Sequence, residues 1–186
     1  MTASRLFPLV AAAGALALGL SGCAASETPA ETTPPADRTS IEVTDNTGTH
    51  TISLPLGPVV ATDNRTFETL DSWGIELAAA PLALMPDTIS YTSNTSIVDL
   101  GNHREPDLII NGQRFADFTD DFAALAPDAT IIELDPREGE PFDVELKRQV
   151  TVLGEIFGKQ TEAKKLTDDF DAAVARVKAA YSADQK

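Results

Sequence analysis

The stretch Leu108-Ile109-Ile110-Asn111-Gly112-Gln113-Arg114 decides the fold class. Its first three residues are an apolar run, typical of a short strand that is buried on both of its faces. The segment 115–125 that follows predicts a helix, and 129–134 predicts another short apolar strand that ends at Asp135-Pro136. Strand, helix and strand in succession favour a parallel sheet.

The same alternation occurs earlier in the chain. Val59-Val60-Ala61 follows Gly57-Pro58 as a short apolar strand, and a helix is predicted from about Thr66, with Gly74 as its end. Three further segments are predicted as a strand at 75–84, a polar loop at 86–96 and a short strand from Ile97. Together these elements predict an α/β fold whose mostly parallel sheet is flanked by helices.

Different elements are expected at the two ends of this region. Segments 41–43 and 49–54 alternate around Asn46-Thr47-Gly48, which predicts a hairpin. Near the end of the sequence, a helix capped by Asp143 is expected to stop at Gly158. Its apolar face is predicted from residues at helical spacing, namely Leu146, Val150, Leu153 and Phe157. A longer helix is predicted from Thr161 to Tyr181.

The composition excludes several classes of protein. The 186 residues carry 29 acidic and 14 basic side chains, a formal charge of -15. Nucleic-acid binding and a polybasic membrane patch both need clustered Lys and Arg, so neither is expected. One Cys excludes an internal disulfide and a Cys-rich zinc site.

The first residues have the pattern of a targeting segment. Arg5 precedes a nearly uninterrupted apolar run at 6–20, which is short for a membrane-spanning helix. The run ends in Leu20-Ser21-Gly22-Cys23, which resembles the lipobox of bacterial lipoproteins. We therefore expect a signal peptide at 1–22 and a lipid-anchored, disordered tether at 23–38, with Cys23 as the lipidated residue. The alternative is an uncleaved membrane anchor with an incidental Cys.

The few basic residues between Thr39 and Pro136 share one setting. This stretch contains sixteen acidic residues but only Arg65, Arg104 and Arg114, and each arginine follows a predicted strand and a short polar turn. The carboxyl ends of parallel strands share the edge of the sheet at which ligands bind. Arginine suits an anion because its planar guanidinium binds carboxylates bidentately. The candidate ligand-binding residues are Asn64, Arg65, His103, Arg104, Gln113 and Arg114. The alternative is local pairing, such as Arg65 with Asp63 or Arg104 with Glu105.

Catalytic and metal-binding motifs are not evident. The sequence has no Gly-rich phosphate loop, no nucleophile elbow and no pair of histidines at metal-ligand spacing. With only His50 and His103, a direct zinc or manganese site is not expected. The sequence therefore predicts a binding protein and not an enzyme.

An ordered set of motifs resembles a known family. Besides the lipobox, these are Gly101-x-x-Arg104-Glu105-Pro106, the Asp107-Leu108-Ile109-Ile110 strand with Gly112 and Arg114, and Ala126-Pro127. The chain resembles the ferric-siderophore-binding lipoproteins of Gram-positive ABC importers. That resemblance implies a ferric siderophore held between two α/β lobes joined by a long helix, with the iron held by the chelator and no cofactor. Arg104 and Arg114 match family positions that hold anionic chelates, and the Asn64-Arg65 turn matches one that lines the cleft.

The resemblance also implies partners and a location. These are an ABC transporter permease and a membrane reached through the lipid anchor, on the extracellular face. Residues 39–158 are expected to form the N-terminal lobe and 159–186 the linking helix, with the second lobe absent from this sequence. A family helix of roughly ten residues is also missing after Pro106. Alternatives are a haem- or cobalamin-binding lipoprotein, a surface-anchored interaction domain without a transport role, and, as a distant third, an anion-handling hydrolase.

Overall fold

The computed structural model describes residues 38–100 and 105–184. These residues belong to one compact unit, Pro34–Lys186. The expected signal peptide at 1–22, the lipidated Cys23 and nearly all of the expected tether lie outside the described residues. Among the helices that are described, none combines the length and the apolar character needed to span a bilayer.

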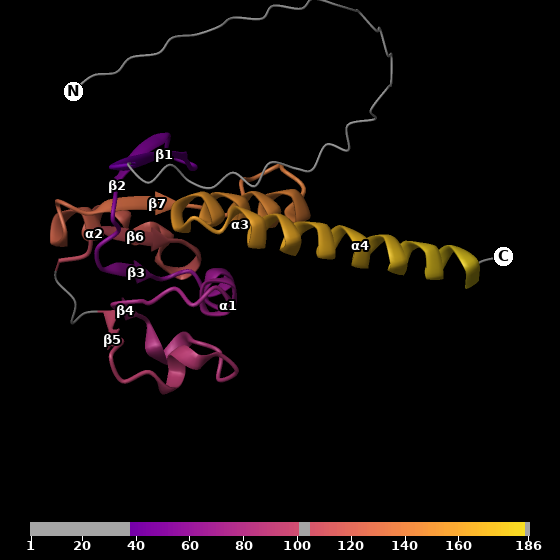
Figure 1. Cartoon of the computed structure of the whole chain (residues 1–186), viewed down its shortest axis with the longest axis horizontal. Helices are drawn as coiled ribbons and strands as arrows, with labels where there is room; N and C mark the ends of the chain where they lie inside the picture. The colour runs from indigo at the N-terminus through magenta and orange to yellow at the C-terminus, as the bar shows by residue number, and fades with distance from the viewer. Residues whose placement is uncertain (1–37, 101–104, 185–186) are drawn as a thin grey trace, which may run out of the picture. The chain divides into compact units, whose positions relative to one another are not determined.

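A five-stranded parallel sheet forms the centre of the domain (Figure 1). Its spatial order is β5-β4-β3-β6-β7, and every neighbouring pair is parallel. The strands are β3 (Val59–Ala61), β4 (Ala79–Ala80), β5 (Val98–Asp99), β6 (Leu108–Asn111) and β7 (Thr130–Glu133). The fold class expected from the apolar runs is therefore confirmed.

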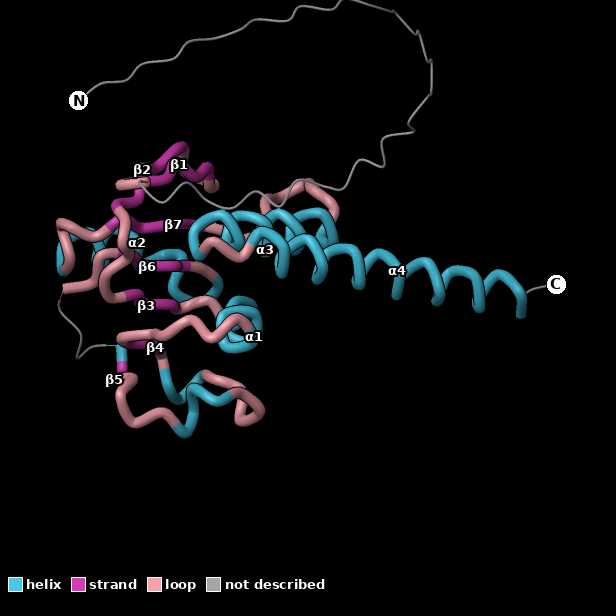
Figure 2. Tube along the Cα trace, in the orientation of Figure 1, coloured by secondary structure: helices cyan, strands magenta, loops and turns pink. Residues whose placement is uncertain are grey.

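Helices cover this sheet, and a hairpin precedes it (Figure 2). The α-helices are α1 (Asn64–Ser72), α2 (Thr119–Leu125), α3 (Phe142–Phe157) and α4 (Gln160–Asp184). Short 3-10 helices lie at η1 (Leu82–Leu84), η2 (Ser90–Ser93) and η4 (Gln113–Phe118). The predicted hairpin is confirmed, with β1 (Ser40–Thr44) antiparallel to β2 (Thr49–Ser53).

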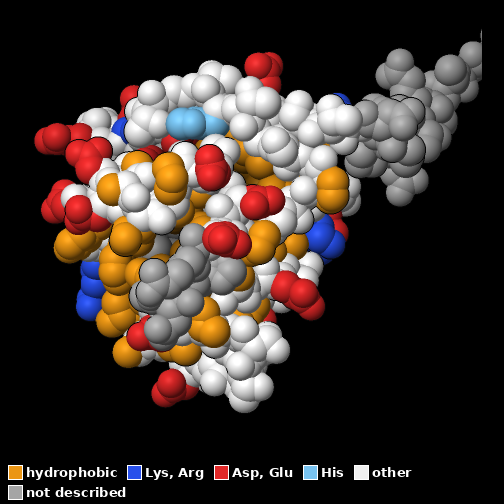
Figure 3. All heavy atoms as spheres, turned by 90° about the vertical axis from the view of Figure 1, so that its left-hand side faces the viewer, with side chains coloured by type: hydrophobic (Ala, Val, Ile, Leu, Met, Phe, Trp, Pro, Cys, Tyr) orange, Lys and Arg blue, Asp and Glu red, His pale blue; other side chains and the backbone are white. Residues whose placement is uncertain are grey.

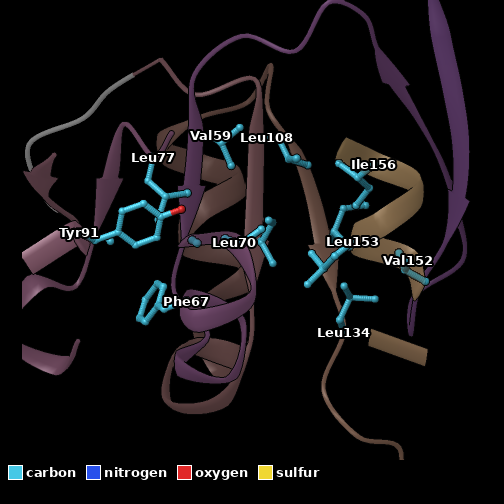
Figure 4. Packing of buried hydrophobic residues seen from close by; sticks show 14 of the residues in the cluster. Val59, Phe67, Leu70, Leu77, Tyr91, Leu108, Leu134, Val152, Leu153 and Ile156 are labelled. Atoms are coloured by element: carbon cyan, nitrogen blue, oxygen red, sulfur yellow. The ribbon is translucent and has the colours of Figure 1, made fainter. Parts of the chain in front are cut away.

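The core lies on both faces of the sheet because successive strand residues point to opposite sides. On one face, Val59 and Leu108 pack with Phe67 and Leu70 of α1 and with Leu153 of α3 (Figure 4). On the other face, a smaller cluster of buried side chains comprises Val60, Ala79 and Ile109. Phe122 of α2 is among the partly buried residues packed against that cluster.

Three predicted boundaries are wrong. The strand expected at 75–84 is only the two residues of β4, because Pro81 has no N–H to continue a ladder and η1 follows. The helix expected at 115–125 begins at Thr119, after the 3-10 turns of η4. Asp143 does not cap α3, which begins at Phe142 after Pro141. Asp143 instead lies in the first turn, where its charge favours the helix dipole.

Helices α3 and α4 approach each other closely at Gly154. A Cβ atom at this position would lie 2.6 Å from the Cβ of Ala163, so only glycine fits without displacing α4. Gly158 ends α3 in the left-handed conformation, as predicted, with φ 65°. Figure 1 shows that α4 continues well past the start of α3, so its second half extends beyond the helix that packs against its first half.

The turn of the hairpin closes the outer edge of β7. The Asp45 carboxylate accepts a hydrogen bond from the Glu133 N–H at 2.7 Å, and the Asn46 N–H donates to the Glu133 carbonyl at 3.0 Å. Burial opposes ionisation of Asp45, but bonds from the Glu133 and Thr47 backbones and from the Thr47 and His50 side chains lower its pKa overall. The backbone N–H and carbonyl of Glu133 at this edge of the sheet are thus both satisfied by the turn of the hairpin.

Candidate functional site

The order of the strands places a crevice outside the carboxyl ends of β3 and β6. From β3 the chain proceeds to β4 on one side and later returns to β6 on the other, so the topology reverses between these two strands. Ligands of open parallel sheets bind at such points. The turns after the two strands are joined, since the Thr62 hydroxyl donates to the Asn111 side-chain oxygen at 2.7 Å.

Arg65 lies in the first turn of α1, two residues after the capping residue Asp63. Its guanidinium donates to both Asp63 oxygens, with Nε–Oδ1 and Nη2–Oδ2 distances of 3.1 Å, and also to Asp135. A cation at a helix N-terminus opposes the helix dipole, and here two carboxylates of the chain compensate it. The Arg65–Asp63 pair foreseen as the local alternative is therefore present, and a contact between Arg65 and a ligand stays a prediction.

The two residues that follow β6, Gly112 and Gln113, lie against the carboxylates of Asp63 and Asp135 that bind Arg65. A Cβ at Gly112 would lie 2.9 Å from an Asp63 oxygen and 3.0 Å from an Asp135 oxygen, so glycine permits both carboxylates to approach. The Gln113 N–H donates to Asp135 at 2.9 Å, and Gln113 adopts a left-handed φ of 53°, which is uncommon for a side-chain-bearing residue. From α3, Gln149 donates to Asp63 at 2.8 Å.

Arg114 differs from Arg65 in its surroundings. It follows Gln113 at the same edge of the sheet, and its side chain is exposed. Within residues 38–100 and 105–184, no carboxylate or other hydrogen-bond acceptor contacts its guanidinium. Of the two predicted arginines that the structure describes, Arg114 is the one whose guanidinium is not paired with another described residue.

The remaining predicted residues are only partly placed. Asn64 is the first residue of α1, half-buried beside Arg65. His103 and Arg104 lie outside the described residues. The next described residues lead into the amino end of β6, where the Asp107 N–H donates to the Pro58 carbonyl at 2.9 Å. Figure 3 faces this amino edge, over which acidic side chains are spread around a more hydrophobic centre.

Sequence reasoning missed a second arginine cluster beside the site. Glu145 of α3 is buried with a fully covered side chain, and its two oxygens accept bonds from Arg137 at 2.6 and 3.0 Å and from Arg148 at 3.0 Å. The hydrogen bond from Arg137 is the main cause that lowers the pKa of Glu145 to about 2. Arg137 follows β7 and the Asp135-Pro136 turn, so it has the same strand, turn and arginine pattern, one residue beyond the stretch in which that pattern was sought.

A buried set of hydrogen-bonded side chains, Asn111, Thr119 and Glu133, joins β6 to β7. The Asn111 side-chain amide donates to the Glu133 carboxylate at 2.8 Å and to the Phe115 carbonyl at 3.0 Å. Thr119 also donates to that carboxylate. Burial raises the pKa of Glu133 despite these hydrogen bonds, and the charges of Asp135 and Asp45 raise it further.

This edge is equipped to recognise an anion through exposed arginine. No group of three or more His, Cys, Asp or Glu side chains suited to a metal ion occurs in the part of the chain that the structure describes. The carboxylates here are committed to partners, since Asp63, Asp135 and Glu145 all accept bonds from arginine. The described edge therefore presents the exposed guanidinium of Arg114 beside carboxylates that are already neutralised by other arginines.

Comparison with known proteins agrees with this fold. The family model described as "Periplasmic binding protein" matches residues 59–186. The ferric-anguibactin-binding protein FatB of Vibrio anguillarum is 29% identical over 172 residues, covering 86% of this chain and 53% of FatB. The chain thus spans about half the length of the curated relative it matches.

Two solved structures resemble the model at low sequence identity. The siderophore-binding protein BauB, solved with two molecules of acinetobactin and ferric iron, has a TM-score of 0.63 at 23% identity, covering 75% of this chain and 53% of BauB. The petrobactin-binding protein YclQ of Bacillus subtilis has a TM-score of 0.65 at 23% identity, covering 76% and 53%. At this identity the likeness supports the fold alone.

Proposed function

Because this chain belongs to the periplasmic binding protein family, we propose that it binds an anionic ferric siderophore at the carboxyl edge of its sheet. The family is one of binding proteins, and the name of FatB specifies a ferric chelate as the ligand of that relative. The observation that carries the proposal is Arg114, an exposed guanidinium beside the point where the strand order reverses. A bidentate guanidinium is suited to the carboxylate or phenolate oxygens of such chelates.

The proposal gives different tasks to three of the arginines that lie near this edge. Arg65 and Arg137 hold the carboxylates of Asp63, Asp135 and Glu145 and so fix the base of the site. Arg114 contacts the ligand. Ligand contacts by Arg104 and His103 stay proposals from their motif alone and are not assigned to the carboxyl edge, because the residues that follow them lead into the amino end of β6.

The remaining parts of the proposal concern delivery. The chain would act as the substrate-binding component of an ABC importer and pass the chelate to a membrane permease. It would be held at the extracellular face of the cell membrane by lipid on Cys23, because the sole Cys follows Leu20-Ser21-Gly22 at the end of an apolar run. The iron would be bound through its chelator and not by protein ligands.

Substituting Arg114 tests the ligand site. We expect Arg114→Ala in the Pro34–Lys186 unit to weaken binding of ferric tris-catecholate roughly ten- to hundredfold, since a charged hydrogen bond contributes about 1.5–3 kcal/mol. Quenching of the fluorescence of Trp73, the single tryptophan, measures the dissociation constant. The matched control is Arg176→Ala on the exposed surface of α4, which should bind as the unsubstituted unit does. Equal affinity in the Arg114→Ala variant, or no binding by the unsubstituted unit, would contradict the proposal.

A separate experiment tests the anchor. The full-length Cys23→Ala variant should accumulate as an unprocessed precursor and take up no labelled fatty acid, because the thioether to lipid requires the thiol. Metabolic labelling with palmitate, followed by electrophoresis, measures both properties. The control is Ser21→Ala, which keeps a small residue before the Cys and should be labelled normally. Normal labelling of Cys23→Ala would show that the chain is not lipidated at this site.

A further inference from the structure

A cavity lies between β7, the hairpin and the start of α2. It has a volume of about 580 Å³, which is within the usual range for small-molecule sites. Five threonines contribute to its lining, together with one carboxylate, that of Glu133. The described residues that line it include no Lys or Arg. The cavity is therefore rich in oxygen atoms and has no permanent cation in its wall.

Glu133 supplies a buried oxygen that lacks a hydrogen-bond partner. The residue is 9% exposed. Its Oε1 atom accepts bonds from Asn111 at 2.8 Å and from Thr119, whereas no donor among the described residues reaches its Oε2 atom. Because Thr119 lines the cavity and contacts this carboxylate, the carboxylate lies at the cavity wall. Buried polar atoms are nearly always paired, so Oε2 calls for a partner that the described chain does not provide.

Ile131 adds an unpaired backbone acceptor to the same wall. The Thr130 N–H donates to the carbonyl of Asp107, just before β6, at 2.9 Å, so the backbone of the next residue faces the opposite edge of β7. Glu133 faces the same way, and the turn of the hairpin satisfies both of its backbone groups. No described residue bonds to the Ile131 carbonyl. This oxygen is therefore open to the cavity that Ile131 lines.

The surroundings of Glu133 favour a positively charged ligand. Burial raises the pKa of Glu133, and the negative charges of Asp135 and Asp45 raise it further. The cationic or titratable groups nearby already have partners, since Arg65 binds Asp135 and His50 Nε2 is hydrogen-bonded to Asp45 at 2.9 Å. A ligand that brings a positive charge would offset the repulsion among these carboxylates. A metal ion is less suited, because the described residues hold no group of three metal-ligating side chains.

We propose that this cavity binds a primary alkylammonium group, whose N–H donors bond to Glu133 Oε2 and to the Ile131 carbonyl. An ammonium group has three donors. The third finds an acceptor in the hydroxyls of Thr51 and Thr130, which line the cavity and make no side-chain hydrogen bond within the described residues. Ala129 is an apolar part of the wall for the alkyl chain. The site shares no residue with the proposed siderophore contacts, so it is independent of them.

NMR titration of the Pro34–Lys186 unit with n-butylammonium chloride at neutral pH tests the site. Saturable shifts are expected at the amides of Thr130 and Ile131. Glu133→Gln should weaken binding roughly tenfold or more, because the charge is lost while an amide oxygen still accepts the two internal hydrogen bonds. The matched control is Glu42→Gln, an exposed carboxylate of β1 outside the cavity, which should bind as the unsubstituted unit does. Circular dichroism confirms that each variant is folded.

Two further ligands test the chemistry of recognition. Tetramethylammonium has the same charge but no N–H donor, so it should bind roughly tenfold more weakly than n-butylammonium. Nα-acetyl-lysine methylamide distinguishes the source of the ammonium group. Tighter binding than n-butylammonium would indicate a lysine side chain of a partner protein, and weaker binding a small free amine. Equal binding of tetramethylammonium, unchanged affinity in Glu133→Gln, or shifts confined to residues outside the cavity would overturn the proposal.

Discussion

Arg65→Ala should lower the free energy of unfolding by about 3 kcal/mol, because it leaves the buried Asp63 carboxylate without its ion-pair partner. Removing one member of a buried pair costs about 3–5 kcal/mol, and we expect the lower end of this range. The Gln149 side chain and the Arg65 N–H still donate to Asp63 in the variant, and the lost guanidinium is itself partly exposed. Chemical denaturation followed by the fluorescence of Trp73 measures the change.

Arg114→Ala is the matched control for this experiment. It also removes one guanidinium from the same edge of the sheet, but an exposed side chain without a carboxylate partner in the described region should change stability by no more than about 0.5 kcal/mol. The two substitutions should therefore affect different quantities. Arg65→Ala should lower the free energy of unfolding, and Arg114→Ala should lower the affinity for the ligand. Unaltered stability of Arg65→Ala would mean that the ion pair does not hold the edge together.

Asn111→Ala should lower the free energy of unfolding by about 2–3 kcal/mol at neutral pH, because it removes a donor from the buried Glu133 carboxylate. The loss should depend on pH in a defined direction. Burial raises the pKa of Glu133 and the hydrogen bond from Asn111 opposes that rise, so the variant raises the pKa further. A carboxyl whose pKa is higher in the folded state destabilises the fold only when ionised. The part of this loss that comes from the ionised Glu133 should thus be recovered as the pH falls through the raised pKa toward the ordinary carboxyl value of about 4.3. The part that comes from the lost bonds to Thr62 and Phe115 should remain at every pH.

The control uses a second substitution at the same contact. In the Asn111→Ala/Glu133→Gln double variant the group that titrates is gone, so the difference in stability from Glu133→Gln alone should not vary over this pH range. Denaturant titrations at several pH values measure all four proteins. A loss in Asn111→Ala that stays constant from neutral to acid pH would contradict the assignment of the effect to Glu133.

The central strands were predictable from local sequence because they are buried on both faces. Leu108-Ile109-Ile110 and Val59-Val60-Ala61 are continuous apolar runs, a pattern with few structural alternatives at that length. The segment 113–118 was less predictable. Its 3-10 turns follow the left-handed Gln113, and the Phe115 carbonyl accepts a bond from the buried Asn111 side chain. The spacing of apolar residues does not predict a hydrogen bond of this kind between a side chain and the backbone.

The meeting of Arg65 and Arg114 at one edge of the sheet was predictable, but the pairing of the side chains at that edge was not. Arg65 and Arg114 follow strands that turned out to be neighbours, so the rule that carboxyl ends share an edge brought them to one side of the sheet. The Asp135 that binds Arg65 is 70 positions away in the chain, and Gln149 is 86 positions from Asp63. These contacts depend on how α3 packs on the sheet. Glu145 and Gln149 occupy positions on the helix face that an apolar pattern would have assigned to the core.

The hairpin that closes the edge of β7 imposes an order on the assembly of the domain during synthesis. Asp45 leaves the ribosome 88 positions before Glu133, the residue whose N–H it binds. Throughout that interval the hairpin has no strand to cover, and once β7 has formed its outer edge stays open until the hairpin docks. Contacts between residues so distant in the chain slow folding, because a large loop must close before they form. A nascent chain that has reached β6 therefore still lacks the strand whose edge its hairpin covers in the folded domain.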